Sequence, residues 1–430
     1  MRARSDTTTM GPGTGSGAIL SVTTLFFAWG FATSIIDTLV PIVKSVFQLS
    51  YTEALLTQFA FFMAYGIVSL PAAALVSRLG FPRSIVLSIA VMILACLGMP
   101  LATQMNQYPL VLLSLFVLAC GITALQVAAN PLCALLGDPA GKHRRLTLSQ
   151  AFNSLGTVLG PLVGSWFLLR GGVFDADAGA AATAEHVRES LHNIDAQFLV
   201  IAAGLALLAL LIWVMRGRLN LAALSAEGGS VLAAFRSGWA LAGALAIFLY
   251  VGAEVSIGSV MINFLEQGST LGATAERAGH LLSLYWGGAM VGRFIGTAVL
   301  SRVEAGRLLT GVAAVAAVLC VVVFGSTGQV AAVCALAIGL FNAVMFPTIF
   351  TLTLERSAAP ASATSGLLCM AIVGGALVPV LTGAVADRLG LGSAFLVPAV
   401  CYAGITLFAL MGLLTRAGAA RPGALGSAAH

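Results

Sequence analysis

Charged residues are scarce in this chain. Of its 430 residues only 9% are Asp, Glu, Lys or Arg, whereas 59% are hydrophobic and the mean hydropathy is +1.01. A soluble globular domain carries about 25% charged residues. The composition therefore excludes a soluble domain and indicates a protein that lies largely within a membrane.

Catalytic and nucleotide-binding motifs are also lacking. The sequence has no HExxH, GxSxG or Walker motif, and no GxGxxG after a strand. We therefore expect neither an enzyme nor an ATP-driven pump, and no organic cofactor. The seven cysteines lie in apolar stretches without CxxC or zinc-site spacing, so we expect free thiols rather than a metal centre.

Long apolar runs are what the chain has in abundance. Runs of about 20 residues, the length that crosses the hydrocarbon core as a helix, recur from end to end. They predict an all-α membrane protein with twelve transmembrane helices in two six-helix bundles. The predicted spans are 18–47, 54–77, 84–102, 108–137, 146–169, 197–215, 238–265, 279–301, 308–326, 329–354, 362–386 and 393–415. The segment 171–195, with His186 and His192, is expected to be a solvated outer loop rather than a metal site.

The distribution of Lys and Arg predicts the orientation of these spans. Inner loops of membrane proteins are enriched in both residue types. With both termini in the cytoplasm, most of the 21 Lys and Arg residues fall on the inner side. The exceptions are Lys44, Arg170, Arg188, Arg277 and Arg388 on the outer side and Arg293 within a span. The net charge of +5 therefore reports topology and not a nucleic-acid-binding surface.

Short sequence matches divide the chain into two halves. FFAWG at 26–30 resembles FLYVG at 248–252, and ALVSR at 74–78 resembles AVLSR at 298–302. Single residues recur as well, namely Arg78 as Arg302, Gly156 as Gly374 and Pro161 as Pro379. Repeats of this kind are typical of secondary transporters, which hold their substrate near the midplane between the halves.

The predicted domains follow from this division. They are a cytoplasmic tail at 1–17, an N-terminal six-helix bundle at 18–216, a cytoplasmic linker at 217–236, a C-terminal six-helix bundle at 237–415 and a cytoplasmic tail at 416–430.

Three charged residues lie inside predicted spans, namely Asp37, Glu254 and Arg293. A charge at the bilayer centre costs on the order of 3 kcal/mol, so such residues usually face a partner or a water-filled cavity. We interpret Asp37 and Glu254 as cation-coupling groups. For Arg293 we favour a structural or gating role, which we also assign to Arg78 and Arg302 at the inner helix ends.

Uncharged polar residues and two tryptophans complete the candidate site. Gln126 and Asn130 are four apart and share a helix face, which suits substrate binding as well as bridging between packed helices. The candidate substrate-binding residues are Gln126, Asn130, Gln150, Asn153, Ser256, Asn263 and Asn342, with Trp29 or Trp286 as a surface on which a sugar ring could stack.

Several of these stretches resemble a known family. They are WGFATSIID at 29–37, QVAANP at 126–131, RLTLSQAFNSLGT at 145–157, YVGAEVSIGS at 250–259, GRFIGT at 292–297 and FPTIF at 346–350. Together they resemble the fucose–galactose–glucose:proton symporter family of the major facilitator superfamily. The resemblance implies two six-helix bundles with alternating access, a monosaccharide substrate, a monomer and a location in the bacterial inner membrane.

The resemblance also bears on ion coupling. In the fucose–proton branch an Asp of the first span and a Glu of the fourth are functional, and Asp37 matches the first. Gln126 stands at the position of that Glu, and a glutamine side chain cannot take up a proton. A glutamine at this position resembles the glucose/galactose branch of the family, and so does Glu254. We therefore expect import of fucose, glucose or galactose by symport with H⁺ or Na⁺, with no metal site unless Asp37 holds Na⁺. Lipid is the expected partner besides the sugar. An uncoupled facilitator, an exporter of another small solute and a transporter-like sugar sensor are the alternatives.

Overall fold

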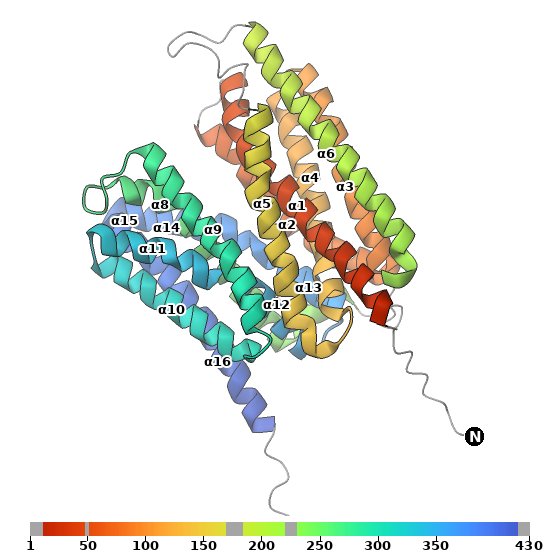
Figure 1. The fold of residues 1–430 in the computed structure, drawn as a ribbon, viewed down its shortest axis with the longest axis vertical. Coiled ribbons are helices and arrows are strands. Elements are labelled where there is room, and N and C mark those ends of the chain that lie inside the picture. The colour runs from red at the N-terminus through yellow and green to blue at the C-terminus, as the bar shows by residue number, and fades with distance from the viewer. Residues whose placement is uncertain (1–11, 48–50, 169–183, 220–229, 420–430) are drawn as a thin grey trace, which may run out of the picture.

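Helices form nearly all of the regular structure. The computed structural model describes residues 12–47, 51–168, 184–219 and 230–419, and the predicted twelve-span arrangement is present in these ranges (Figure 1). The N-terminal half contains α1 (Pro12–Val46), α2 (Tyr51–Leu79), α3 (Phe81–Gln104), α4 (Tyr108–Leu135), η1 (Pro139–Gly141), α5 (Lys142–Leu168) and α6 (Ala184–Leu219). The predicted all-α fold with two bundles is confirmed.

The C-terminal half repeats six passes, of which the last three each consist of two helices in series. It contains η3 (Val231–Arg236), α8 (Gly238–Glu266), α9 (Ala275–Val299), α10 (Ala305–Gly325), α11 (Gly328–Asn342), α12 (Met345–Arg356), α13 (Ala361–Met370), η4 (Ala371–Val373), α14 (Gly374–Leu389), α15 (Leu391–Ala394) and α16 (Leu396–Ala419). We call the face at which α1 begins and α16 ends the terminal face (Figure 1).

Two passes are less apolar than the rest. Ten stretches of the described helices are long and apolar enough to cross a membrane, and neither α5 nor α9 is among them. These two helices meet where the halves touch, and the rings of Phe152 and Phe294 lie 6.1 Å apart there. Polar residues on the contacting faces, such as Ser154 and Arg293, therefore have protein neighbours in place of lipid, which is why the helices tolerate them.

The internal repeat reappears in the packing of helices. Gly156 lets α5 cross α1 closely, because a Cβ atom there would lie 2.3 Å from the carbonyl oxygen of Phe27. Gly374 does the same for α14 and α8, where a Cβ atom would lie 2.2 Å from the carbonyl oxygen of Phe248. Equivalent helices of the two halves thus cross at equivalent glycines.

Ionic and polar contacts join the two halves at the terminal face. Lys142 at the start of α5 lies 3.1 Å from Glu355 at the end of α12, and His143 lies 3.6 Å from the same carboxylate. The Nδ1 atom of His143 is also 2.6 Å from the hydroxyl of Thr351. The halves are therefore held together at this face.

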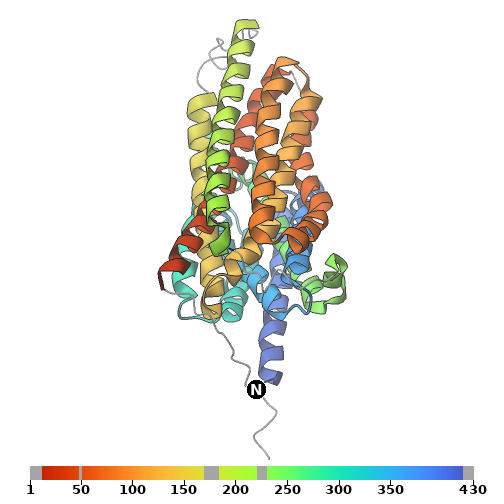
Figure 2. The same cartoon turned by 90° about the vertical axis from the view of Figure 1, so that its right-hand side faces the viewer.

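The prediction of a solvated loop at 171–195 is wrong for its second part. Helix α6 begins at Ala184 and runs for 36 residues, so it extends beyond the neighbouring helices at the face opposite the terminal face (Figure 2). Ser190 and Ile194 are buried in it, while His192 is exposed as expected and the side chain of His186 lies outside the described residues. Charged residues such as Arg188 and Asp195 lower the hydropathy of this segment, which is why the sequence predicted a loop, but they do not interrupt the helix.

Candidate functional site

The fourth helix of each half carries the same short pattern, a carboxamide five residues before a proline. In α4 these residues are Gln126 and Pro131, and in α11–α12 they are Asn342 and Pro347, 216 residues later. Asn342 is the last residue of α11, so the second copy lies at the break between two helices. The repeat thus places two equivalent amide side chains inside the two bundles.

Each proline frees a backbone carbonyl. Proline has no N–H, so the carbonyl four residues earlier loses its helical donor and needs another one. In α4 the freed carbonyl belongs to Val127, and the hydroxyl of Ser365 from the other half donates to it at 2.8 Å. In the C-terminal half it belongs to Ala343, and Nε of Arg293 donates to it at 3.1 Å.

A tyrosine holds each carboxamide. Nε2 of Gln126 donates to the hydroxyl of Tyr65 on α2 at 2.5 Å, and Nδ2 of Asn342 donates to the hydroxyl of Tyr285 on α9 at 2.9 Å. The single hydroxyl proton of Tyr285 goes to the carbonyl of Glu254 at 3.2 Å, so this oxygen can only accept from Asn342. Oδ1 of Asn342 therefore points away from the tyrosine, and it has no hydrogen-bond partner among the described residues.

The N-half cluster is formed by Tyr65, Gln126, Asn130 and Gln150. All four are buried, and Nε2 of Gln150 lies 3.5 Å from Oδ1 of Asn130. Each member is uncharged at neutral pH, and three of them are amides that both donate and accept hydrogen bonds. The sequence analysis named Gln126, Asn130 and Gln150 as separate candidates, which the structure brings into one cluster, and it did not name Tyr65.

The C-half cluster is formed by Tyr250, Glu254, Tyr285, Arg293 and Asn342. The hydroxyl of Tyr250 donates to Oε1 of Glu254 at 2.7 Å, and Nη2 of Arg293 lies 3.9 Å from the same oxygen. The side chains of Glu254 and Arg293 are each only 13% exposed. The two predicted charges of this half thus form a largely buried ion pair, which compensates part of the cost of removing each from water.

Arg293 connects the two clusters. Its Nη1 atom donates to the hydroxyl of Ser154 on α5, and that hydroxyl donates in turn to the carbonyl of Gln150 at 3.2 Å. A continuous polar chain therefore runs from Glu254 across the interface to Gln150. The arginine lies between the halves, which is compatible with the gating role predicted for it.

Other predicted residues lie in different surroundings. Asp37 is on α1, but its side chain lies outside the described residues. Trp29 is 4% exposed and packs on Phe26 with ring centroids 4.2 Å apart, so it offers little surface for stacking. Nδ2 of Asn153 donates to the carbonyl of Phe26 at 2.9 Å and braces α1 against α5.

The candidates on α8 and α9 also differ in how deeply they are buried. Ser256 is fully buried and its hydroxyl has no partner among the described residues, whereas Asn263, two turns further along α8, is exposed. Trp286 is 40% exposed and meets Tyr285 edge to face. Arg78 and Arg302 are both exposed at helix ends on the terminal face.

Tyr65 and Tyr250 are the cluster members that the sequence analysis missed. A signal was present, because Tyr65 and Tyr285 are 220 residues apart, close to the spacing of the other repeat pairs. For metals, the described residues contain no group of three His, Cys, Asp or Glu side chains that could hold an ion. All seven cysteines are free thiols, as predicted.

Known proteins share this architecture. The model of the Major Facilitator Superfamily matches residues 22–368. The "Glucose/galactose transporter" of Brucella abortus (strain 2308) is 44% identical over 398 residues, which cover 92% of this chain and 94% of the relative. The "L-fucose-proton symporter" of Escherichia coli (strain K12) is 30% identical over 401 residues, which cover 90% of both chains. The crystal structure of the transporter FucP in the outward conformation matches with a TM-score of 0.83 at 27% identity, covering 92% of this chain and 98% of that one.

Proposed function

Because the chain belongs to the major facilitator superfamily, and within it to the fucose–galactose–glucose symporter family, we propose that it imports a hexose of the glucose–galactose type by symport with a cation. The family consists of transporters, so the chain is not an enzyme. Between the two named sugar classes, the degree of identity favours the glucose/galactose relative, at 44% against 30%.

The observation that carries the proposal is the pair of matched carboxamides, Gln126 and Asn342, which occupy equivalent positions of the two halves. An amide held by a tyrosine at its nitrogen presents its oxygen as an acceptor, as Asn342 does. Sugar hydroxyls are donors that suit such acceptors. Gln150 adds a polar group beside Asn130 in the N-half cluster, and Trp286, which is more exposed than Trp29, is the better placed of the two predicted stacking residues.

Alternating access requires that the halves separate at one face and close at the other. The contacts of Lys142 and His143 with Glu355 keep the terminal face closed in the structure. With the termini in the cytoplasm, as the Lys and Arg distribution predicts, a sugar would enter from the outer face and leave after these contacts break. We assign the protein to the bacterial inner membrane as a monomer on the same family grounds.

Two carboxylates are candidates for ion coupling. Glu254 already has Arg293 and Tyr250 as partners, so its negative charge is compensated whether or not an ion is bound. Asp37 is the residue that matches the coupling carboxylate of the fucose–proton branch. We therefore assign the coupling H⁺ or Na⁺ to Asp37 first, and to Glu254 as a second site.

The experiment that tests the function is uptake of labelled sugar into proteoliposomes. Glucose, galactose and fucose would each be offered under an inward Na⁺ gradient, an inward proton gradient or no gradient, with protein-free liposomes as the control. We expect accumulation of glucose or galactose above the external concentration with one of the two gradients. Uptake that only reaches equilibrium would establish an uncoupled facilitator, and saturable binding without counterflow would establish a sensor.

A further inference from the structure

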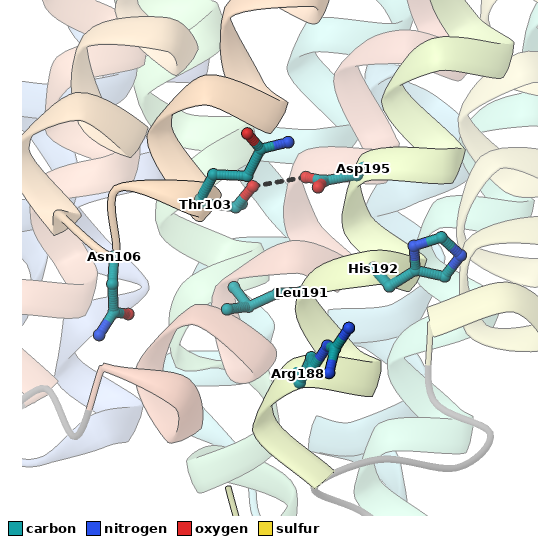
Figure 3. A pocket seen from close by; sticks show the side chains of 7 residues that line it. Thr103, Asn106, Arg188, Leu191, His192 and Asp195 are labelled. Carbon is teal, nitrogen blue, oxygen red and sulfur yellow. Dashed lines mark hydrogen bonds between the residues drawn. The ribbon is translucent and has the colours of Figure 1, made fainter. Parts of the chain in front are cut away.

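A polar pocket lies outside the two clusters. It has a volume of about 410 Å³ and lies between the end of α3 and the beginning of α6 (Figure 3). Its lining residues are Thr103, Gln104, Asn106, Arg188, Leu191, His192 and Asp195. Both helices belong to the N-terminal half and lie on its side away from the C-terminal half (Figure 1). The pocket is therefore not part of the path between the halves.

The pocket carries charges of both signs on a single helix face. Arg188, His192 and Asp195 are four and three residues apart, so they follow one another along α6. The hydroxyl of Thr103 lies 2.6 Å from Oδ1 of Asp195 and ties the end of α3 to α6 (Figure 3). One carboxylate oxygen is thereby fixed at the pocket wall, while Arg188 and His192 remain exposed.

The depth of the pocket matches the surface of a bilayer. The apolar stretch of α3 ends at Gln104 and that of α6 begins at Arg188, so the lining residues lie where two membrane spans leave the hydrocarbon. On the membrane side of the pocket, Leu97 and Leu101 of α3 and Val200 of α6 are 51%, 61% and 69% exposed. Acyl chains can lie against these side chains while a headgroup occupies the pocket.

We infer that this pocket binds the phosphoethanolamine headgroup of a membrane phospholipid. Arg188 and His192 hold the phosphate, because guanidinium and imidazole N–H groups are strong donors to phosphate oxygens. Asp195 accepts hydrogen bonds from the ammonium group. A phosphocholine headgroup has no N–H to donate, and a phosphoglycerol headgroup has no cation, so the carboxylate distinguishes phosphoethanolamine from both.

Native mass spectrometry of the full-length protein tests the inference. The protein would be delipidated and then mixed with phosphatidylethanolamine, phosphatidylcholine or phosphatidylglycerol of identical acyl chains. We expect phosphatidylethanolamine to be retained on the order of tenfold more than the other two, the effect of one additional hydrogen bond to a charged group. Equal retention of the three lipids would overturn the inference.

Variants locate the bound lipid. Asp195→Asn keeps a polar group beside Thr103 and should remove the preference for phosphatidylethanolamine, whereas Arg188→Gln should weaken retention of all three lipids. The double variant Asp387→Asn with Arg388→Gln makes the same charge changes at another exposed site, in the last turn of α14, and should leave retention unchanged. A preference that survives Asp195→Asn would overturn the assignment.

Two soluble competitors separate the possible sources of the ligand. We expect free phosphoethanolamine to displace the lipid only at a large excess, because it lacks the acyl chains that contact Leu97 and Leu101. Displacement at concentrations comparable to the lipid would identify a soluble phosphorylated amine as the ligand and overturn the lipid assignment. Displacement by glucose or galactose would identify a sugar site and overturn it as well.

Discussion

The fourth pass of the N-terminal half and its counterpart in the C-terminal half solve the same structural problem with different donors. Both have a carboxamide five residues before a proline, and both leave one carbonyl to be satisfied from another helix. In the N-terminal half the donor is Ser365, a neutral hydroxyl that comes from the opposite half. In the C-terminal half it is Arg293, a charged donor from the same half.

The two clusters thus share the geometry of the repeat but differ in charge. The N-half cluster is neutral and amide-rich, which suits recognition of hydroxyl groups. The C-half cluster contains a largely buried ion pair whose arginine also donates to Ser154 across the interface. A change in the charge of Glu254 would therefore affect the contact between the halves, whereas a change in the N-half cluster would, under the proposed function, affect sugar binding first.

Replacement of Asp37 by Asn should give the largest effect on transport, because it removes the carboxylate proposed as the first site of the coupling ion. A single coupled charge is worth about 2.3 kcal/mol at 100 mV, or roughly 50-fold accumulation. We expect this accumulation to fall to equilibrium while sugar counterflow continues. Proteoliposome uptake and counterflow measured side by side would check this, and accumulation retained in the variant would exclude Asp37 as the coupling group.

Removal of one partner of the C-half ion pair should destabilise the protein more than removal of both. Arg293→Gln leaves Glu254 buried beside Tyr250 without its cation, at a cost of about 3 kcal/mol. The double variant Arg293→Gln with Glu254→Gln should recover part of this loss. Thermal unfolding in detergent of the wild type, both single variants and the double variant measures the coupling energy, and additive losses would show that the pair does not interact.

Substitution of the crossing glycines tests whether the helices pack equally closely in the two halves. Gly156→Ala and Gly374→Ala each place a methyl group within 2.3 Å of a carbonyl oxygen, so both should lower the free energy of unfolding by about 1–3 kcal/mol. Gly287→Ala on α9 is the matched control, since nothing lies within 4 Å of its Cβ position. Its unfolding temperature should stay at or above that of the wild type. Equal losses in all three variants would indicate a general effect of helix glycines.

The smallest expected effect concerns the hydrogen bond that crosses the halves. Ser365→Ala leaves the carbonyl of Val127 without a donor, at a cost of about 1 kcal/mol. Because the bond joins the two halves, the loss should favour their separation and raise maleimide labelling of the buried thiol of Cys369, read by mass spectrometry.

Addition of Pro131→Ala provides the control for this variant. Alanine restores an N–H within α4, so the carbonyl of Val127 regains a helical donor and labelling of Cys369 should return toward the wild-type level. Labelling that stays high in the double variant would mean that Ser365 acts through another contact.

Much of the candidate site was visible in the sequence. The intramembrane residues Glu254, Arg293, Gln126, Asn130, Gln150 and Asn342 all lie in or between the two clusters. They could be recognised because a polar group without a partner is costly in hydrocarbon, and the residue type and its position within an apolar stretch are both visible in the sequence. Asn263, by contrast, is exposed, because residues that share a helix face can still lie at different depths.

The sequence by itself determined the number of passes, their division into two halves and the family, because transfer of apolar side chains into lipid is a local property of each stretch of about 20 residues. Only the tertiary structure decided which groups meet. Three examples are the hydrogen bond of Tyr285 with the amide of Asn342, that of Ser365 with the carbonyl of Val127, and that of Thr103 with Asp195 beside the pocket between α3 and α6. All three depend on the rotation and crossing of helices distant in sequence. Hydrogen bonds act over about 3 Å, so a pattern that predicts each helix does not specify the neighbours of its side chains.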